Sequence, residues 1–136
     1  MRISAAIHQQ MIDHALADAP DECCGMVAAR DGEAVAAYPI SNAAHSPLRY
    51  EMDPREQLAV EFGEIYDRDL EVGIIYHSHT RSAPYPSQTD INLATHPEAI
   101  YVIVGVKDRE HPEVRGYRIR DGEVTEVALE IIDAAV

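Results

Sequence analysis

Three segments of the chain are expected to form helices, and the first two carry apolar residues at the spacing of an amphipathic helix. They cover residues 5–18, 53–69 and 87–96. Ser4 and Asp53 can cap the first two, and Pro97 ends the third. In the second segment, the expected buried stripe consists of Leu58, Phe62, Ile65 and Tyr66.

Short apolar runs between these helices predict β-strands. The expected strands cover residues 24–30, 33–40, 48–52, 71–77, 99–106, 114–120 and 123–132. Asp31-Gly32 and Asp121-Gly122 separate neighbouring strands and predict tight hairpin turns. No repeat or linker interrupts the series. This order predicts one α/β domain over residues 1–136, a three-layer sandwich with a central mixed β-sheet flanked by helices.

Composition narrows the classes of protein to consider. The chain has 136 residues, of which 46% are hydrophobic and 26% charged, as expected of a globular domain. No apolar run reaches the ~20 residues of a membrane span, and the first residues lack the apolar core of a secretory signal. We therefore expect a cytoplasmic protein. The net charge of −13 argues against a nucleic-acid partner, because phosphate contacts need clustered Lys and Arg.

The two cysteines, Cys23 and Cys24, are adjacent. Neighbouring cysteines form a disulfide only with strain, and their side chains on a strand point to opposite faces. Neither a disulfide nor a shared metal is expected. We expect one of the two to pack inward as a small hydrophobic residue.

The stretch GIIYHSHTRSAPYPSQTDI, residues 73–91, concentrates the candidate chemistry. His77 and His79 lie two apart at the end of an apolar run, so an extended chain puts both imidazoles on one face. Asp90 follows in the first turn of an expected helix. Two nitrogens and one carboxylate oxygen suit Zn²⁺, and three protein ligands leave a fourth position open, as in catalytic sites.

Local structure offers a second explanation for part of this pattern. Ser87 and Asp90 fit a capping box, in which both residues serve only to begin a helix. The two roles are compatible. A zinc hydrolase also needs a general base, and among many glutamates Glu22 is the candidate that precedes an apolar strand.

These residues resemble the motif of the JAMM (MPN+) zinc metallopeptidases. That motif has His-x-His, seven residues, Ser, two residues and Asp, which matches HSHTRSAPYPSQTD in full. PDECCG is similar to the family's upstream element, in which a Glu precedes a Gly by three positions. The resemblance extends over nearly the whole chain.

The resemblance implies a fold like that of cytidine deaminases and one Zn²⁺ per chain, bound by His77, His79 and Asp90. It also implies that Glu22 holds a water and moves its proton, and that Ser87 stabilises the oxyanion. Deaminase chemistry itself is not expected, because the His-x-Glu and Pro-Cys-x-x-Cys signature is absent.

Within the family, the chain looks most like the short bacterial members that act on ubiquitin-like sulfur carriers. This implies a zinc peptidase that cleaves after the C-terminal glycine of a β-grasp carrier ending in Gly-Gly, and releases cysteine. Tyr85 and Pro86 are then expected along the path of the carrier tail, unless they are only turn residues. Alternatives are an isopeptidase that removes a ubiquitin-like modifier from proteins, or an MPN scaffold without activity. A homodimer is plausible from exposed strand edges.

Overall fold

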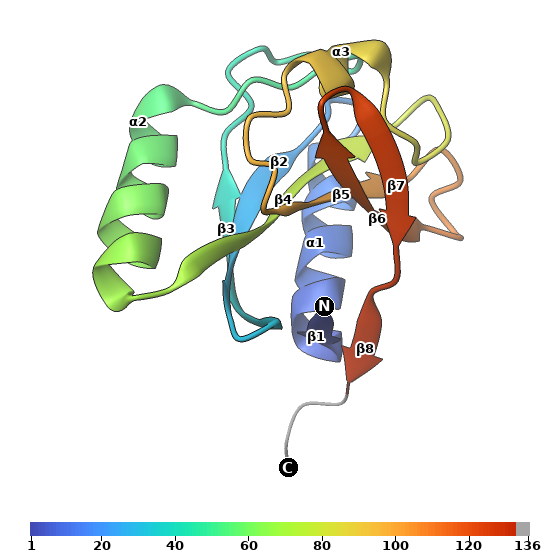
Figure 1. Cartoon of the computed structure of the whole chain (residues 1–136). Coiled ribbons are helices and arrows are strands. Elements are labelled where there is room, and N and C mark those ends of the chain that lie inside the picture. The colour runs from blue at the N-terminus through green and yellow to red at the C-terminus, as the bar shows by residue number, and fades with distance from the viewer. Residues whose placement is uncertain (133–136) are drawn as a thin grey trace.

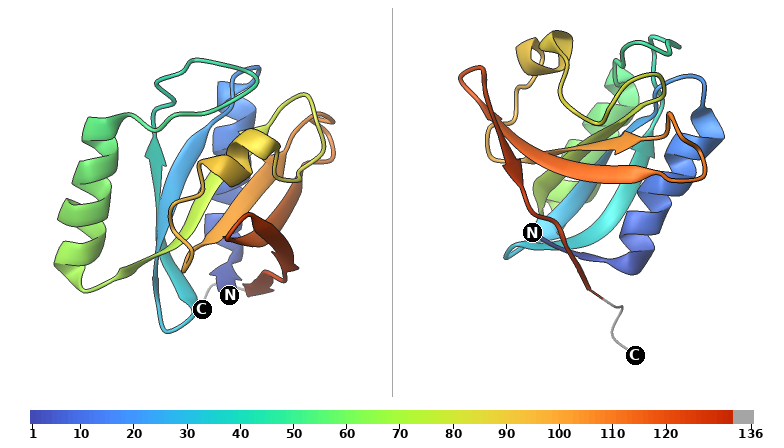
Figure 2. Two further views of the ribbon diagram at one scale, coloured as in Figure 1. Left: turned by 45° about the horizontal axis from the view of Figure 1, so that its top comes forward. Right: turned by 90° about the vertical axis from the view of Figure 1, so that its right-hand side faces the viewer.

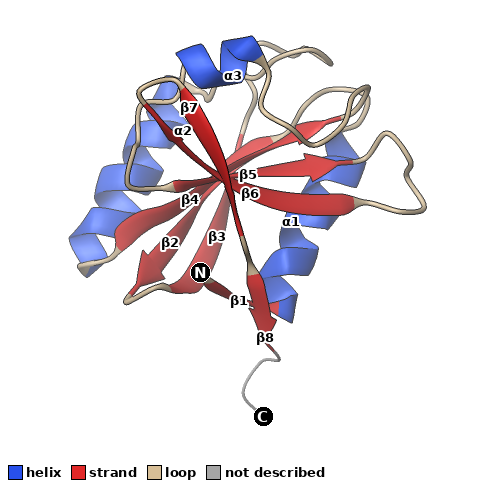
Figure 3. Ribbon diagram, turned by 45° about the vertical axis from the view of Figure 1, so that its right-hand side comes forward, coloured by secondary structure: helices blue, strands red, loops and turns tan. Residues whose placement is uncertain are grey.

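One eight-stranded mixed sheet organises the residues that the computed structural model describes, 1–132 (Figure 1). The strands are β1 (Arg2–Ser4), β2 (Cys24–Arg30), β3 (Glu33–Ile40), β4 (Glu71–His79), β5 (Ile100–Gly105), β6 (Glu113–Arg120), β7 (Glu123–Val127) and β8 (Glu130–Ile132). Their order across the sheet is β7-β6-β5-β4-β2-β3-β1-β8. The β4–β5 pair is parallel, as are β1–β3 and β1–β8, and the remaining pairs are antiparallel. Only residues 128–129 join β7 to β8 at the opposite ends of this order, so the sheet curls (Figure 3).

Helices cover both faces of the sheet, which confirms the expected α/β sandwich (Figure 2). Helix α1 (Ala5–Asp18) packs on one face. Helix α2 (Pro54–Leu58), continued by π-helical turns (Ala59–Ile65) and a 3₁₀ turn (Tyr66–Arg68), lies on the other side with α3 (Gln88–Asn92). Among the described helices, none has the length and apolarity needed to cross a bilayer.

Strand alternation divides the apolar side chains between the two faces. Ile74 and Tyr76 of β4 belong to the cluster that contains α1, and Ile75 belongs to the opposite cluster. The adjacent cysteines divide in the same way, with Cys23 in the first cluster and Cys24 in the second. We expected one of the two to pack inward; both are buried, because both faces of this sheet are covered.

Both expected hairpin turns are present. Asp31 and Gly32 have φ of 53° and 77°, and Asp121 and Gly122 have φ of 52° and 78°. Two successive residues with positive φ define the turn that matches the twist of the flanking strands.

The second expected helix differs from its prediction in what it buries. Ile65 is buried, but Leu58, Phe62 and Tyr66 are 59%, 54% and 43% exposed. The prediction assumed α-helical spacing throughout. The π-helical turns hold more residues per turn, because their hydrogen bonds run from i to i+5, and the apolar residues rotate away from the sheet.

Three other segments also differ. Residues 48–52 form no strand, and only Met52 makes an isolated bridge, to Asn42. The expected last strand, residues 123–132, is divided into β7 and β8, because β8 pairs with β1 at the other edge of the sheet. Strand β1 has three residues, and no sequence pattern predicted it. Helix α3 ends at Asn92 rather than at residue 96.

Candidate metal centre

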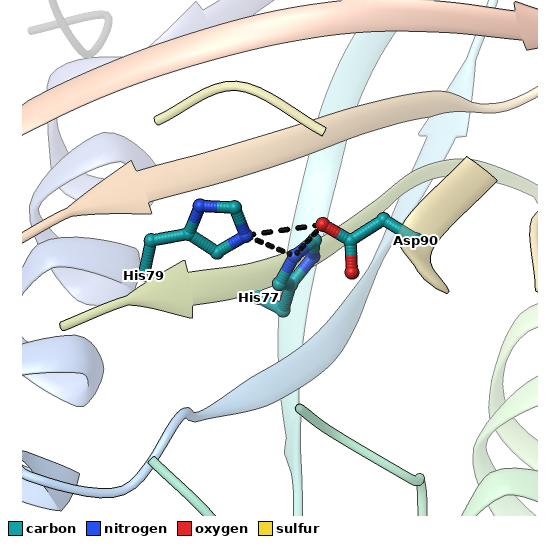
Figure 4. A group of neighbouring side chains, drawn as sticks. All are labelled: His77, His79 and Asp90. Atoms are coloured by element: carbon teal, nitrogen blue, oxygen red, sulfur yellow. Dashed lines mark hydrogen bonds and ion pairs between the residues drawn. The ribbon is translucent and has the colours of Figure 1, made fainter. Parts of the chain in front are cut away.

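Three side chains meet at the end of β4, on the side of the sheet where α3 begins (Figure 4). His77 Nε2 lies 3.2 Å from His79 Nε2 and 3.1 Å from Asp90 Oδ2, and His79 Nε2 lies 3.0 Å from the same oxygen. The three residues are 1%, 4% and 9% exposed. The structure thus brings together the three residues that the sequence predicted as metal ligands.

The donor set fits a zinc ion. Zn–N and Zn–O bonds of about 2.0–2.1 Å in a tetrahedral arrangement put neighbouring donor atoms about 3.3 Å apart, close to the spacing seen here. The two Nε2 atoms and Asp90 Oδ2 lie within 3.2 Å of one another, so a single cation among them could accept one lone pair from each.

His79 is held in the tautomer that a metal ligand needs. Its Nδ1 lies 2.9 Å from the carbonyl oxygen of Ala83, which can only accept a hydrogen bond. Nδ1 therefore carries a hydrogen, so Nε2, which faces Asp90, is the nitrogen that can bind a metal ion. The loop that follows β4 supplies this carbonyl, so the same segment orients the imidazole and leads into α3.

Asp90 has both roles that its sequence context allows. The Ser87 amide donates to Asp90 Oδ2 at 2.9 Å, and the Asp90 amide donates to Ser87 Oγ at 3.1 Å, which completes a capping box. The same Oδ2 faces the two imidazoles. The cap therefore fixes the carboxylate at the position where a cation would need it.

Glu22 lies beside this group, two residues before β2 begins. The β2–β4 pairing aligns Cys24 with His77, and the Ser78 amide donates to the Cys23 carbonyl at 3.1 Å. This register places Glu22 near His79. The glutamate is 4% exposed, and its Oε1 has no hydrogen-bond partner among the described residues. Burial, together with Asp90, outweighs the attraction of His79 and raises the pKa of Glu22 to about 7.

The other charged groups of the site have their pKa values shifted in different directions. Burial lowers the pKa of His77, against the opposing effect of Asp90. Burial also acts to lower the pKa of His79, but its bonds to Asp90 and to the Ala83 carbonyl raise it on balance. Burial acts to raise the pKa of Asp90, yet hydrogen bonds from both imidazoles hold it well below its usual range. The carboxylate is thus ionised and ready to bind a cation.

The remaining predicted residues lie in the loop between β4 and α3. Ser87 is the N-cap of α3 and is an exposed residue, and its Oγ accepts the hydrogen bond of the Asp90 amide. Pro86 is buried. Tyr85 is 57% exposed and packs edge-on against Tyr117 with ring centroids 5.5 Å apart. None of these contacts tests whether Tyr85 and Pro86 line a substrate path, which stays a prediction.

Sequence reasoning missed two residues that shape the centre. Ser78, between the two histidines, accepts a hydrogen bond from the Cys23 amide at 2.8 Å and joins β4 to the segment before β2 that carries Glu22. The position of Ser78 between the two histidines could have marked it as a residue of the site. The ring of Tyr50 stacks on His77 with centroids 4.4 Å apart. No local pattern marked Tyr50, since it lay inside an expected strand that does not form.

Comparison with known proteins agrees with this geometry. The family model described as prokaryotic homologs of the JAB domain matches residues 4–120. The CysO-cysteine peptidase of Mycobacterium tuberculosis is 42% identical over 133 residues, which cover 96% of this chain and 90% of that one. The desampylase of Haloferax volcanii is 36% identical over 111 residues, covering 76% and 78%.

Solved structures show the same architecture. Protein DSY2949 of Desulfitobacterium hafniense superimposes with a TM-score of 0.87 at 27% identity, over 98% of this chain and 93% of that one. AF2198, a JAB1/MPN domain protein of Archaeoglobus fulgidus, superimposes with a TM-score of 0.64 at 22% identity, over 98% and 100%. The second likeness supports the fold alone.

Proposed function

The chain belongs to the family of prokaryotic JAB-domain homologues and is a JAMM-type peptidase, and we propose that it cleaves cysteine from a ubiquitin-like sulfur carrier. The bond broken would be the amide after the C-terminal glycine of a carrier that ends in Gly-Gly. The proposal is supported by the similarity to a CysO-cysteine peptidase along 96% of the chain. The observation that carries the peptidase chemistry is the convergence of His77, His79 and Asp90 beside buried Glu22.

We assign one Zn²⁺ per chain to the three converging side chains. His77 and His79 would bind through Nε2, and Asp90 through Oδ2. When bound there, zinc supplies a Lewis acid that polarises the substrate carbonyl and makes water a stronger nucleophile near neutral pH.

Glu22 is suited to carry the proton. Its carboxylate would accept a proton from the attacking water, as the C–O bond forms, and deliver it to the amine nitrogen as the C–N bond breaks. A pKa of about 7 matches this task, because the group can both accept and release a proton near neutral pH. We assign Ser87 to donate its hydroxyl hydrogen to the oxyanion, since its Oγ accepts from the Asp90 amide and keeps its own hydrogen to donate.

Mass spectrometry of two conjugates tests the substrate. One is a ubiquitin-like carrier whose C-terminal glycine is joined to the α-amine of cysteine, and the other is the same carrier joined to the ε-amine of a lysine peptide. We expect the zinc-loaded protein to release cysteine from the first, and the Glu22→Gln variant to release none. Cleavage of the second alone would favour the isopeptidase alternative, which the desampylase relative supports.

The binding-scaffold alternative has a separate test. A scaffold needs no metal, so the zinc content of the purified protein would stay below a few tenths of an ion per chain, even after incubation with zinc. One ion per chain, with loss of turnover on its removal, would argue against a scaffold. A cytoplasmic location and a homodimer stay predictions.

A further inference from the structure

The two histidines of the metal centre differ in what holds their second ring nitrogen. His79 Nδ1 donates to the Ala83 carbonyl. His77 Nδ1 is buried and has no hydrogen-bond partner within residues 1–132. A histidine that binds metal through Nε2 carries its hydrogen on Nδ1, and an acceptor there normally fixes the ring. His77 needs another support to keep its orientation.

Tyr50 provides a contact of the right kind. Its ring stacks on the imidazole of His77 with centroids 4.4 Å apart and planes inclined by 25°. Stacking of this sort is worth about 0.5–1.5 kcal/mol beyond the area that it buries. It restricts rotation of the His77 ring out of the plane in which Nε2 faces His79 and Asp90.

Asn42 in turn holds Tyr50. Its Nδ2 donates to the Arg49 carbonyl at 3.1 Å, and its Oδ1 accepts from the Glu51 amide at 2.9 Å. These two peptide groups flank Tyr50 on either side. The Asn42 side chain is 7% exposed, so water competes little for these bonds.

The same amide group also reaches the proposed general base. Asn42 Nδ2 donates its other hydrogen to the Glu22 carbonyl at 3.0 Å, and Oδ1 accepts a second bond from the Ala44 amide at 3.0 Å. All four hydrogen-bonding positions of the side chain are used. One buried amide thus joins the backbone of Glu22 to the segment that carries Tyr50.

We infer that Tyr50 is a positioning residue for His77, replacing the hydrogen bond that usually orients a metal-bound histidine, and that Asn42 holds Tyr50 in place. The inference rests on the proposed zinc centre. Neither residue is assigned a contact with substrate. Both act through residues that do make the site.

Zinc affinity of the folded protein tests the role of Tyr50. The Tyr50→Leu variant removes the aromatic face, Tyr50→Phe keeps it, and Tyr66→Leu is a matched control at an exposed tyrosine. Competition with a chromophoric chelator gives each zinc dissociation constant, and circular dichroism in EDTA shows that each variant is folded. We expect Tyr50→Leu to bind zinc about 10- to 100-fold more weakly, as for loss of an outer-shell partner. Tyr50→Phe and Tyr66→Leu should stay close to wild type.

A double-mutant cycle tests Asn42 and guards against misfolding of a single variant. Asn42→Asp keeps the accepting Oδ1 but replaces the donating Nδ2 by a second oxygen, so it should weaken zinc binding as well. If Asn42 acts through Tyr50, the losses of Asn42→Asp and Tyr50→Leu will not add in the double variant. Wild-type affinity in Tyr50→Leu, or additive losses, would overturn the inference while leaving the zinc centre intact. Failure of the wild-type protein to bind zinc would overturn both.

Discussion

Replacement of Glu22 by glutamine should stabilise the metal-free protein above about pH 7. In the zinc-loaded protein the same replacement should abolish turnover. The structure buries this carboxyl group and raises its pKa from 4.5 to about 7. A carboxyl group whose pKa is raised by folding costs no stability while it is protonated in both the folded and the unfolded chain. Above the folded value both states are ionised, and the full cost of burying the charge remains.

The size of the effect follows from that difference in pKa. At 1.36 kcal/mol per pKa unit, a rise from 4.5 to about 7 corresponds to roughly 3 kcal/mol of lost stability at pH values above 7. Solvent that reaches the site screens part of this, so we expect about 1–2 kcal/mol. Below about pH 4.5 the carboxyl is protonated in the folded and unfolded chains alike, and the cost disappears.

Urea unfolding in EDTA at about pH 5 and about pH 8 measures the difference. The wild-type protein should lose more stability between the two pH values than Glu22→Gln by about 1–2 kcal/mol. Each protein is compared with itself at the two pH values, so any effect of the glutamine amide that does not depend on pH cancels. Glu64→Gln, at an exposed position, should keep the wild-type slope. Equal slopes for wild type and Glu22→Gln would refute the assignment of a buried, perturbed carboxyl at this position.

Further predictions concern the metal, the oxyanion and the core. His77→Ala should lose zinc while His111→Ala, at an exposed histidine, keeps it, as measured by metal analysis after gel filtration. Ser87→Ala should lower kcat about 10²- to 10³-fold and retain zinc, and an unchanged kcat would contradict the oxyanion role. Turnover should fall between about pH 7 and 5 as the ligand imidazoles protonate and release zinc, so a flat profile would count against a zinc enzyme. Gly25→Ala should lower the free energy of unfolding by about 1–3 kcal/mol, because a Cβ there would lie 2.5 Å from the Tyr76 ring; wild-type stability in urea would disprove the clash.

The fold was predictable where one local rule dominates. Turns such as Asp31-Gly32 and the apolar run of β4 have signals that a short window contains. Prediction failed where tertiary contacts decide the outcome. The segment 48–52 reads as a strand, but the Arg49 carbonyl and the Glu51 amide bond to the side chain of Asn42 instead of to a neighbouring strand. Strands β1 and β8 are three residues each and exist because they pair with each other across the whole chain.

The convergence of the three residues predicted as metal ligands could be foreseen for a different reason. His77 and His79 share a face because of strand geometry, and Asp90 stands at a helix start that can be read from the capping box. The residues that orient these ligands carry no such mark. Tyr50 reaches His77 from a loop, and the carbonyl of Ala83 belongs to the backbone, which any residue would supply.

Asp90 shows why the capping and ligand interpretations of the same four residues reinforce each other. A buried carboxylate that is preorganised to bind a cation has lost its water shell and keeps one orientation. Both conditions destabilise the metal-free protein. The Ser87 amide offsets part of this by donating to the same Oδ2 that faces the imidazoles, and the imidazoles lower the pKa of the acid further. The bond that begins the helix therefore also keeps the ligand ionised and aimed. A site preorganised in this way gives up little conformational freedom when the cation binds.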